Sequence, residues 1–332
     1  MTANPAPSSA PSSTTSRPAI TGPLASMWAL FLGVLLLMLG NGLQGTLVGV
    51  RSSIEEFNTV VIGVILAAYY AGFLVGSRFT MRALAKVGHV RVFAALASTA
   101  STAALLYAVF VNPPTWFFMR FTTGFCLAGL YVVIESWLNN QATPATRGRT
   151  LSIYMVLTMG GVAGGQFLLT VGDPASFELF VLASVLVSIS LVPMALSEAS
   201  APPQTTVASL PFKTLYAIVP TGIITMLFTG AAAGALFAIA PVYAVQIGMS
   251  NAQISVFIAA SLVGAVIFQM PIGMISDRVP RRGVIAGVAG TASAASLLGI
   301  GTGTSTAAFT AMCVIGATSC LLYTSPSPRD RG

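Results

Sequence analysis

Two ionisable side chains stand inside long apolar runs of the sequence, where a charge is costly. Arg120 lies about 7 Å into the run 115–138, and Glu135 is the only acidic residue well inside such a run. A charge at membrane depth is functional by default. The two lie about 22 Å apart along one helix and cannot pair. We therefore expect both residues to be functional, with Glu135 as a candidate proton or substrate site. The alternatives are an arginine that reaches the outer interface and a carboxylate neutralised by Arg147 or Arg149.

Neutral polar side chains also occur at the expected membrane depth. They are Asn41, Gln44, Tyr69, Tyr70, Tyr131, Gln166 and Gln269. Such groups often only join helices by hydrogen bonds, and each is also a candidate for lining a solute path. Uncharged hydrogen-bonding groups near the midplane suit a neutral or amphipathic solute.

Glycines at helical spacing form a further pattern. Two overlapping G-x-x-x-G pairs lie in the run 150–171, and another glycine lies in the run before it. These residues are Gly160, Gly161, Gly164, Gly165 and Gly124. Small residues at such spacing let helix backbones approach closely in a bilayer, so we interpret them as helix-packing residues.

The elements that must position these residues are membrane-spanning helices by composition. Hydrophobic residues make up 55% of the chain and charged residues only 7%, with a mean hydropathy of +0.86. A soluble domain carries about 25% charged residues. Apolar runs of about 20 residues cross the hydrocarbon core as helices, because lipid offers the backbone no hydrogen-bond partner.

We therefore predict an all-α membrane protein with about nine complete spans and the start of another. The predicted spans are 26–49, 59–78, 90–111, 115–138, 150–171, 177–196, 215–240, 252–275 and 283–300, with a further one starting near residue 306. Pro241 is expected to kink or end the seventh span.

The segments between and beyond the spans divide the chain. We interpret them as a disordered cytoplasmic tail (1–25), an N-terminal bundle (26–196), a central cytoplasmic linker (197–213), a partial C-terminal bundle (214–319) and a final segment (320–332). The final segment resembles the translation of a sequencing-library adapter and interrupts an apolar run. We interpret it as an artefact and expect the natural chain to continue beyond Ser319.

Basic residues occur in alternate loops. The net charge is +7, and the loop cations are Arg78, Arg82, Lys86, Arg91, Arg147, Arg149, Arg278, Arg281 and Arg282. By the positive-inside rule, the N-terminus and the even-numbered span ends lie in the cytoplasm, in a plasma membrane that we expect to be a bacterial inner membrane. This topology explains the charge without nucleic acid. His89, the only histidine, falls in a basic loop, so no metal or other cofactor is expected.

The loop after the eighth span carries a motif. It contains Gly273, Asp277, Arg278, Arg281 and Arg282, and it resembles the G-x-x-x-D-R-x-G-R-R signature of the major facilitator superfamily. The aspartate can pair with an arginine or accept from a helix N-terminus, so we interpret the loop as a conformational gate. The corresponding loop in the first half keeps Lys86 and Gly88 but lacks the aspartate.

Two other segments strengthen the resemblance. Arg120 opens a stretch similar to the family's R-x-x-Q-G element, with Thr123 in place of glutamine, and segments 40–46 and 131–139 resemble the YcaD-type branch of bacterial permeases. The resemblance implies two parallel repeats of about six helices, about twelve spans in all, with solute bound near the midplane. It also implies a role for Arg120 in proton coupling.

The leading hypothesis is a secondary transporter that moves a small solute by alternating access, with protons as the candidate coupling ion. The alternatives are an uncoupled facilitator or exporter of amphipathic compounds, the permease part of an ATP-driven pump, and a sensor built on a transporter scaffold. An intramembrane enzyme needs convergent nucleophiles, acids or histidines, which this sequence lacks. We expect a monomer in the lipid bilayer.

Overall fold

The computed structural model describes residues 27–142, 146–196, 212–218, 220–276, 281–302, 312 and 314. Its helices are α1 (Trp28–Ile54), α2 (Thr59–Val87), α3 (His89–Val109), α4 (Pro113–Gln141), α5 (Arg147–Phe167), a 3-10 turn η2 (Leu168–Thr170), α6 (Glu178–Ile189), α7 (Leu191–Ala195), α8 (Phe212–Ile218), α9 (Pro220–Gln246), α10 (Asn251–Ser276) and α11 (Arg281–Thr302). Within these ranges the chain forms no β-strand, as expected from its composition.

Helix ends follow local chemistry at several turns. Asn58 and Asn112 cap α2 and α4 by accepting hydrogen bonds from the backbone N–H groups of Val60 and Thr115. Gly88, with φ of 86°, ends α2 and starts α3, because glycine adopts this left-handed conformation without steric cost. These residues convert long apolar runs into discrete helices.

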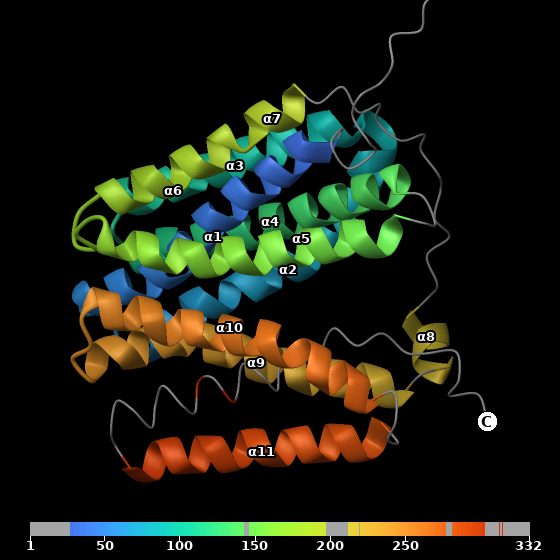
Figure 1. The fold of residues 1–332 in the computed structure, drawn as a ribbon. Helices are drawn as coiled ribbons and strands as arrows, with labels where there is room; N and C mark the ends of the chain where they lie inside the picture. Colours follow the sequence, from blue (N-terminus) through green and yellow to red (C-terminus); the bar gives the residue numbers. More distant parts are fainter. Residues whose placement is uncertain are drawn as a thin grey trace, which may run out of the picture.

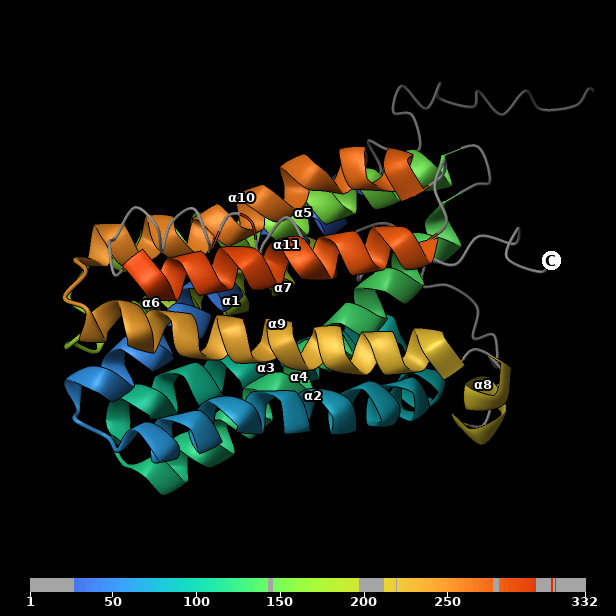
Figure 2. The ribbon, with the colours of Figure 1, turned by 90° about the horizontal axis from the view of Figure 1, so that it is seen from below.

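The helices form a bundle of nearly parallel rods (Figure 1). In the first half, α1 packs on α5 and α6, and α4 packs on α2 and α3. In the second half, α10 lies against α5 and α9 against α1 and α2, with α11 beside α10 (Figure 2). Among the described residues, 7 helical segments are long and apolar enough to cross a membrane, and Gly230–Gln246 of α9 is a shorter apolar helix.

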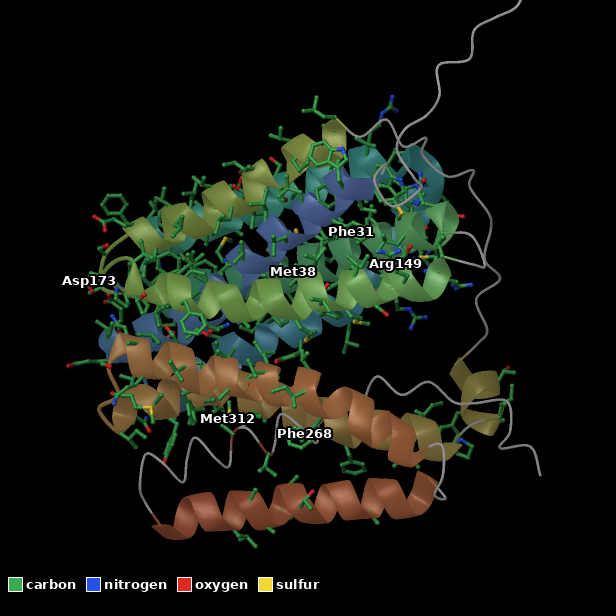
Figure 3. The ribbon with its side chains drawn as sticks, in the orientation of Figure 1. Phe31, Met38, Arg149, Asp173, Phe268 and Met312 are labelled. Carbon is green, nitrogen blue, oxygen red and sulfur yellow. The ribbon has the colours of Figure 1, made fainter. Side chains whose placement is uncertain are left out.

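The two ends of the bundle carry opposite charges (Figure 3). One end, here called the acidic end, carries Glu55, Glu56, Asp173 and Glu178. The other, here called the basic end, carries Arg78, Arg82, Lys86, Arg91, Arg147 and Arg149. Asp173 and Arg149 mark these opposite ends in Figure 3.

Two hydrophobic clusters divide the core along its length. The acidic-end cluster joins both halves: Leu47 of α1 and Trp116 of α4 belong to it together with Ile254 and Phe257 of α10. The basic-end cluster, around Trp137, draws all its described members from residues 27–194 of the first half. In Figure 1, α5 and α10 diverge towards the basic end. The described halves are therefore packed together at the acidic end.

Three local predictions need correction. Several helices extend past one end of the predicted spans, most of all α2, which runs nine residues beyond Arg78 to Val87. Pro241 lies inside α9 and does not end it. His89 is not a loop residue: it begins α3, is buried, and places Nε2 3.0 Å from the Ser136 hydroxyl oxygen of α4.

Candidate functional site

Aromatic side chains from α2 and α4 form a continuous row between the two membrane-depth charges, here called the aromatic track. It consists of Tyr69, Phe73 and Tyr131. The ring centroids of Tyr69 and Phe73 lie 6.1 Å apart, as do those of Phe73 and Tyr131. All are half-buried. Because Tyr69 contacts Arg120 and Tyr131 lies one helical turn before Glu135, the track joins the two predicted charged residues.

Arg120 lies inside the bundle and not at its surface. Its side chain is only 8% exposed, and its guanidinium carbon is 4.9 Å from the centre of the Tyr69 ring. Such a cation–π contact stabilises the charge but does not neutralise it. No carboxylate within the described ranges lies within 4.0 Å of Arg120. The alternative of an arginine reaching the outer interface is therefore wrong for this structure.

Glu135 meets a neutral donor. The Tyr154 hydroxyl donates a hydrogen bond of 3.3 Å to its carboxylate, whereas Arg147 donates to Asn139 instead, at 2.9 Å. No ion pair joins Glu135 to Arg147 or Arg149 in the described part of the chain, which corrects the alternative drawn from the sequence. The residue is exposed and lies about 9 Å from the end of α4 that carries the basic residues.

The other polar residues predicted to line a solute path differ in their burial and hydrogen bonds. Tyr70 donates to the Gly234 carbonyl of α9 at 3.2 Å, so it lies on the face of the first half that contacts the second. Tyr131 donates to the Met38 sulfur of α1 at 3.2 Å, within the first half. Asn41 is half-buried on α1. The Gln44 side chain is buried, and its Nε2 donates no hydrogen bond to any described group.

Gln166 connects three helices. Its side-chain amide donates to the Gly42 carbonyl at 3.0 Å, and its side-chain oxygen accepts from Thr46, both in α1. Its backbone carbonyl accepts a 2.6 Å hydrogen bond from Ser255 of α10. Buried and hydrogen-bonded to α1 and α10, Gln166 joins helices in this structure.

The glycines also take separate roles. Gly161 and Gly165 lie against the backbone or Cβ atoms of α1, and Gly164 faces a side chain of that helix, whereas Gly160 faces open space. Gly124 is packed on α2, where an added Cβ would lie 1.9 Å from the Tyr69 carbonyl oxygen. The close-packing interpretation therefore holds for these residues except Gly160.

Sequence reasoning missed several residues of this region. They are Met38, Gly72, Phe73, Gly76, Tyr154 and Ser255. Gly72 and Gly76 follow the same four-residue spacing used to select the α5 glycines, so the pattern was present. Met38 and Phe73 look like ordinary apolar residues, and only their contacts distinguish them.

Part of the predicted gate lies outside the described residues. Asp277 and Arg278 fall there, Gly273 lies in α10, and Arg281 and Arg282 begin α11. Gln269 lies in α10, but its side chain is also outside the description. In the first-half loop, Lys86 is exposed near the end of α2, and Gly88 makes the turn into α3.

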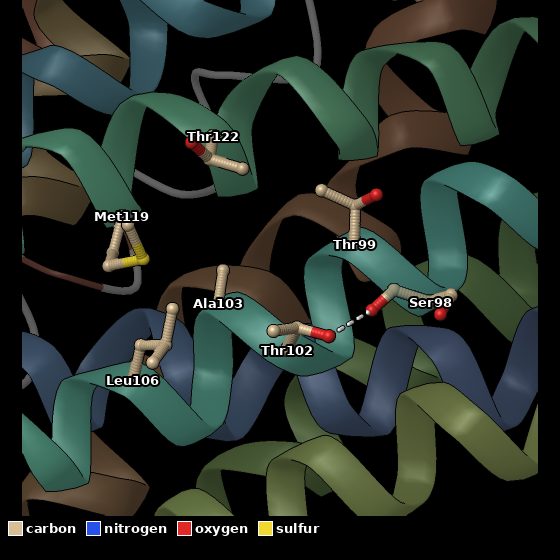
Figure 4. A pocket seen from close by; sticks show the side chains of 7 residues that line it. All are labelled: Ser98, Thr99, Thr102, Ala103, Leu106, Met119 and Thr122. Carbon is tan, nitrogen blue, oxygen red and sulfur yellow. Dashed lines mark hydrogen bonds between the residues drawn. The ribbon is translucent and has the colours of Figure 1, made fainter.

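A pocket of about 300 Å³ lies elsewhere, on the exposed side of α3 and α4 (Figure 4). It is lined by Ser98, Thr99, Thr102, Ala103, Leu106, Met119 and Thr122. The hydroxyls of Thr99 and Thr102 donate to carbonyls of their own helix. The described residues form no group of three or more His, Cys, Asp or Glu side chains suited to a metal ion.

The sequence of this chain matches a known protein family. The family model described as Major Facilitator Superfamily matches residues 30–327. An uncharacterized MFS-type transporter, YcaD, of Escherichia fergusonii is 26% identical over 253 residues, covering 75% of this chain and 66% of that protein. The match thus spans slightly under two thirds of the relative's length.

Solved structures share the fold. A single-residue mutant of the nucleoside transporter NupG superposes with a TM-score of 0.72 at 14% identity, covering 90% of this chain and 80% of that one. A D-xylose-proton symporter gives 0.68 at 14% identity, covering 89% and 79%. At this identity the likeness concerns the fold alone.

Proposed function

The chain belongs to the Major Facilitator Superfamily, whose members are transporters and not enzymes, and from that premise we propose that it moves a small solute across the membrane by alternating access. The supporting observation is the unequal packing of the halves. The acidic-end cluster contains residues of α9 and α10, whereas the described basic-end cluster contains none. This is the packing expected of a state that opens towards the basic end.

The orientation follows from charge. The basic end contains the short loops rich in arginine, and the positive-inside rule supports placing it in the cytoplasm. The state described would then open inwards. The aromatic track, with a charge near each end, would form one wall of the solute path.

Glu135 is our candidate for proton coupling. Its carboxylate is exposed at the basic end and accepts from a tyrosine without an ion pair in the described chain. A carboxylate without a fixed cation can gain and lose a proton without breaking an ion pair. The fold shared with a D-xylose-proton symporter is compatible with this role.

Solute-driven proton movement would test the proposal. The purified protein would be reconstituted into liposomes with a pH-sensitive dye inside, and nucleosides, pentoses and organic acids would be added one at a time outside. We expect at least one solute to change the luminal pH, and a proton gradient to drive its accumulation. Flux that ignores the gradient would favour an uncoupled facilitator, and binding without any flux would favour a sensor.

A further inference from the structure

The charge on Arg120 has no partner among the acidic residues that the structure describes. Glu55 pairs with Arg51 at 2.5 Å, and Glu135 is about 22 Å away along α4. The other described acids, Glu56, Asp173 and Glu178, are exposed at the acidic end. Outside the described ranges the sequence holds only Glu198, Asp277 and Asp330 as further acids.

Other buried donors near Arg120 also lack acceptors in the described part. The Arg120 Nε and the Trp116 Nε1 are fully buried and form no hydrogen bond there. Trp116 and Arg120 share a face of α4, one turn apart, and the ring centroids of Trp116 and Tyr107 lie 5.5 Å apart. The Tyr107 hydroxyl also lies near the guanidinium. The described part of the chain thus places buried donors around a cation and offers no anion beside them.

An anionic acceptor would satisfy this cluster. A buried cation needs a compensating charge, and charge-assisted hydrogen bonds to carboxylate are the strongest that a guanidinium makes. Water could accept from the neutral donors but would not balance the charge. Since the described chain offers no carboxylate, we propose that the anion is the transported solute, and that Arg120 binds its carboxylate during the transport cycle.

The aromatic track defines the rest of the solute. Tyr69 lies directly against the guanidinium, and Phe73 and Tyr131 continue the row towards the basic end, where the described halves do not pack together. Half-buried rings suit an apolar or aromatic body and not a chain of hydroxyls. The predicted solute is therefore a small amphipathic monocarboxylate. This inference rests on the proposed function and narrows its solute class.

The test compares ligands that differ from one another either in charge or in the size of the apolar body. Cyclohexanecarboxylate, its neutral amide cyclohexanecarboxamide, and acetate would be titrated into the purified protein in lipid nanodiscs, with tryptophan fluorescence and the melting temperature as readouts. Trp116 lies one turn from Arg120 and should report binding. We expect the carboxylate to give a saturable change and a higher melting temperature, acetate to bind more weakly, and the amide to give no response.

Substitutions at Arg120 test whether this residue binds the carboxylate. Arg120→Gln should abolish the carboxylate response, and Arg120→Lys should weaken binding by about tenfold, because lysine lacks the bidentate fork. Arg147→Gln, which removes an exposed arginine of the basic end, is the matched control and should bind normally. If Arg120→Gln does not fold, the comparison of acid with amide on the unmodified protein still decides the matter.

The inference is overturned by equal responses to acid and amide, by no response to either, or by unchanged binding in a folded Arg120→Gln variant. Its failure is separable from that of the proposed function. Transport of a neutral solute that survives Arg120→Gln would leave alternating access standing and reject the acidic solute. Carboxylate binding without any flux would support the site and reject transport.

Discussion

The Glu135 carboxylate accepts a hydrogen bond from a hydroxyl and forms no ion pair in the described part of the chain. This difference determines which protonation states the residue can adopt. An ion pair with Arg147 would hold the carboxylate charged, but Arg147 donates to Asn139 instead. A tyrosine hydroxyl can donate to a carboxylate and can also accept from a carboxylic acid. The same pair of residues can therefore accommodate both protonation states.

Replacing Glu135 by glutamine would test the coupling role. The amide keeps the shape and can still accept from Tyr154, but it takes up no proton at neutral pH. We expect solute-driven change in luminal pH to fall by at least about tenfold, while exchange of solute across the membrane persists. Glu178→Gln, at the exposed acidic end, is the control and should couple normally. Normal coupling in Glu135→Gln would remove this residue from the proton path.

At the scale of elements, α2 and α4 pack with almost no space between their backbones. A Cβ added at Gly72 would lie 1.9 Å from the Phe121 carbonyl oxygen, and one added at Gly76 would lie 2.2 Å from that of Phe125. From the opposite side, Gly124 is packed on Tyr69. This contact positions Tyr69 and Arg120 against each other, so the geometry of the track depends on glycine at these positions.

Alanine at Gly72 should therefore destabilise the protein, although alanine favours helices. Overpacking of this kind costs about 1–3 kcal/mol, more than the gain of about 1 kcal/mol from helix propensity. Gly63, in the same helix, faces open space and is the matched control. We expect a lower melting temperature for Gly72→Ala and an unchanged or higher one for Gly63→Ala. Equal melting temperatures would show that α2 and α4 separate without cost.

The order and type of the helices could be predicted from the sequence, because long apolar runs separated by polar turns leave few alternatives in lipid. The residues at which the helices begin and end are harder to predict from the sequence. Arg78, Arg82 and Lys86 were interpreted as loop residues, yet α2 continues through them, since a helix is not confined to the thickness of the hydrocarbon core. Hydropathy marks the apolar part of a helix and not its hydrogen-bonded limits.

The site was predictable only in part, and for a different reason. A charge inside an apolar run is visible in the sequence, so Arg120 and Glu135 could be selected. Their partners Tyr69 and Tyr154 come from other helices, and the side of a helix that faces each neighbour is set by packing. Gln166 shows the converse, because its polarity indicated a solute path whereas its hydrogen bonds join helices.

At the scale of the whole molecule, contacts between the halves at the acidic end must break if the protein opens on that side. The Ser255 hydroxyl donates to the Gln166 carbonyl at 2.6 Å, and Pro241 packs on Gly49. Tyr70 adds a hydrogen bond to α9. The Ser255–Gln166 hydrogen bond is absent by geometry from any state in which α5 and α10 separate, and the other two contacts are lost where α9 leaves α1 and α2.

Ser255→Ala should therefore shift the balance of states and not only weaken the fold. A hydrogen bond between membrane helices contributes about 0.6 kcal/mol on average, so its loss would raise the population open at the acidic end by about threefold. Ser261 is the matched control, since its buried hydroxyl donates only within α10, to Ile258. A cysteine placed at Met249, buried in the acidic-end cluster, would report opening through its rate of alkylation by a membrane-impermeant maleimide. Faster labelling in Ser255→Ala than in Ser261→Ala would support the acidic end as a gate. Equal rates would mean that the Ser255 hydrogen bond is not broken when the two halves move apart.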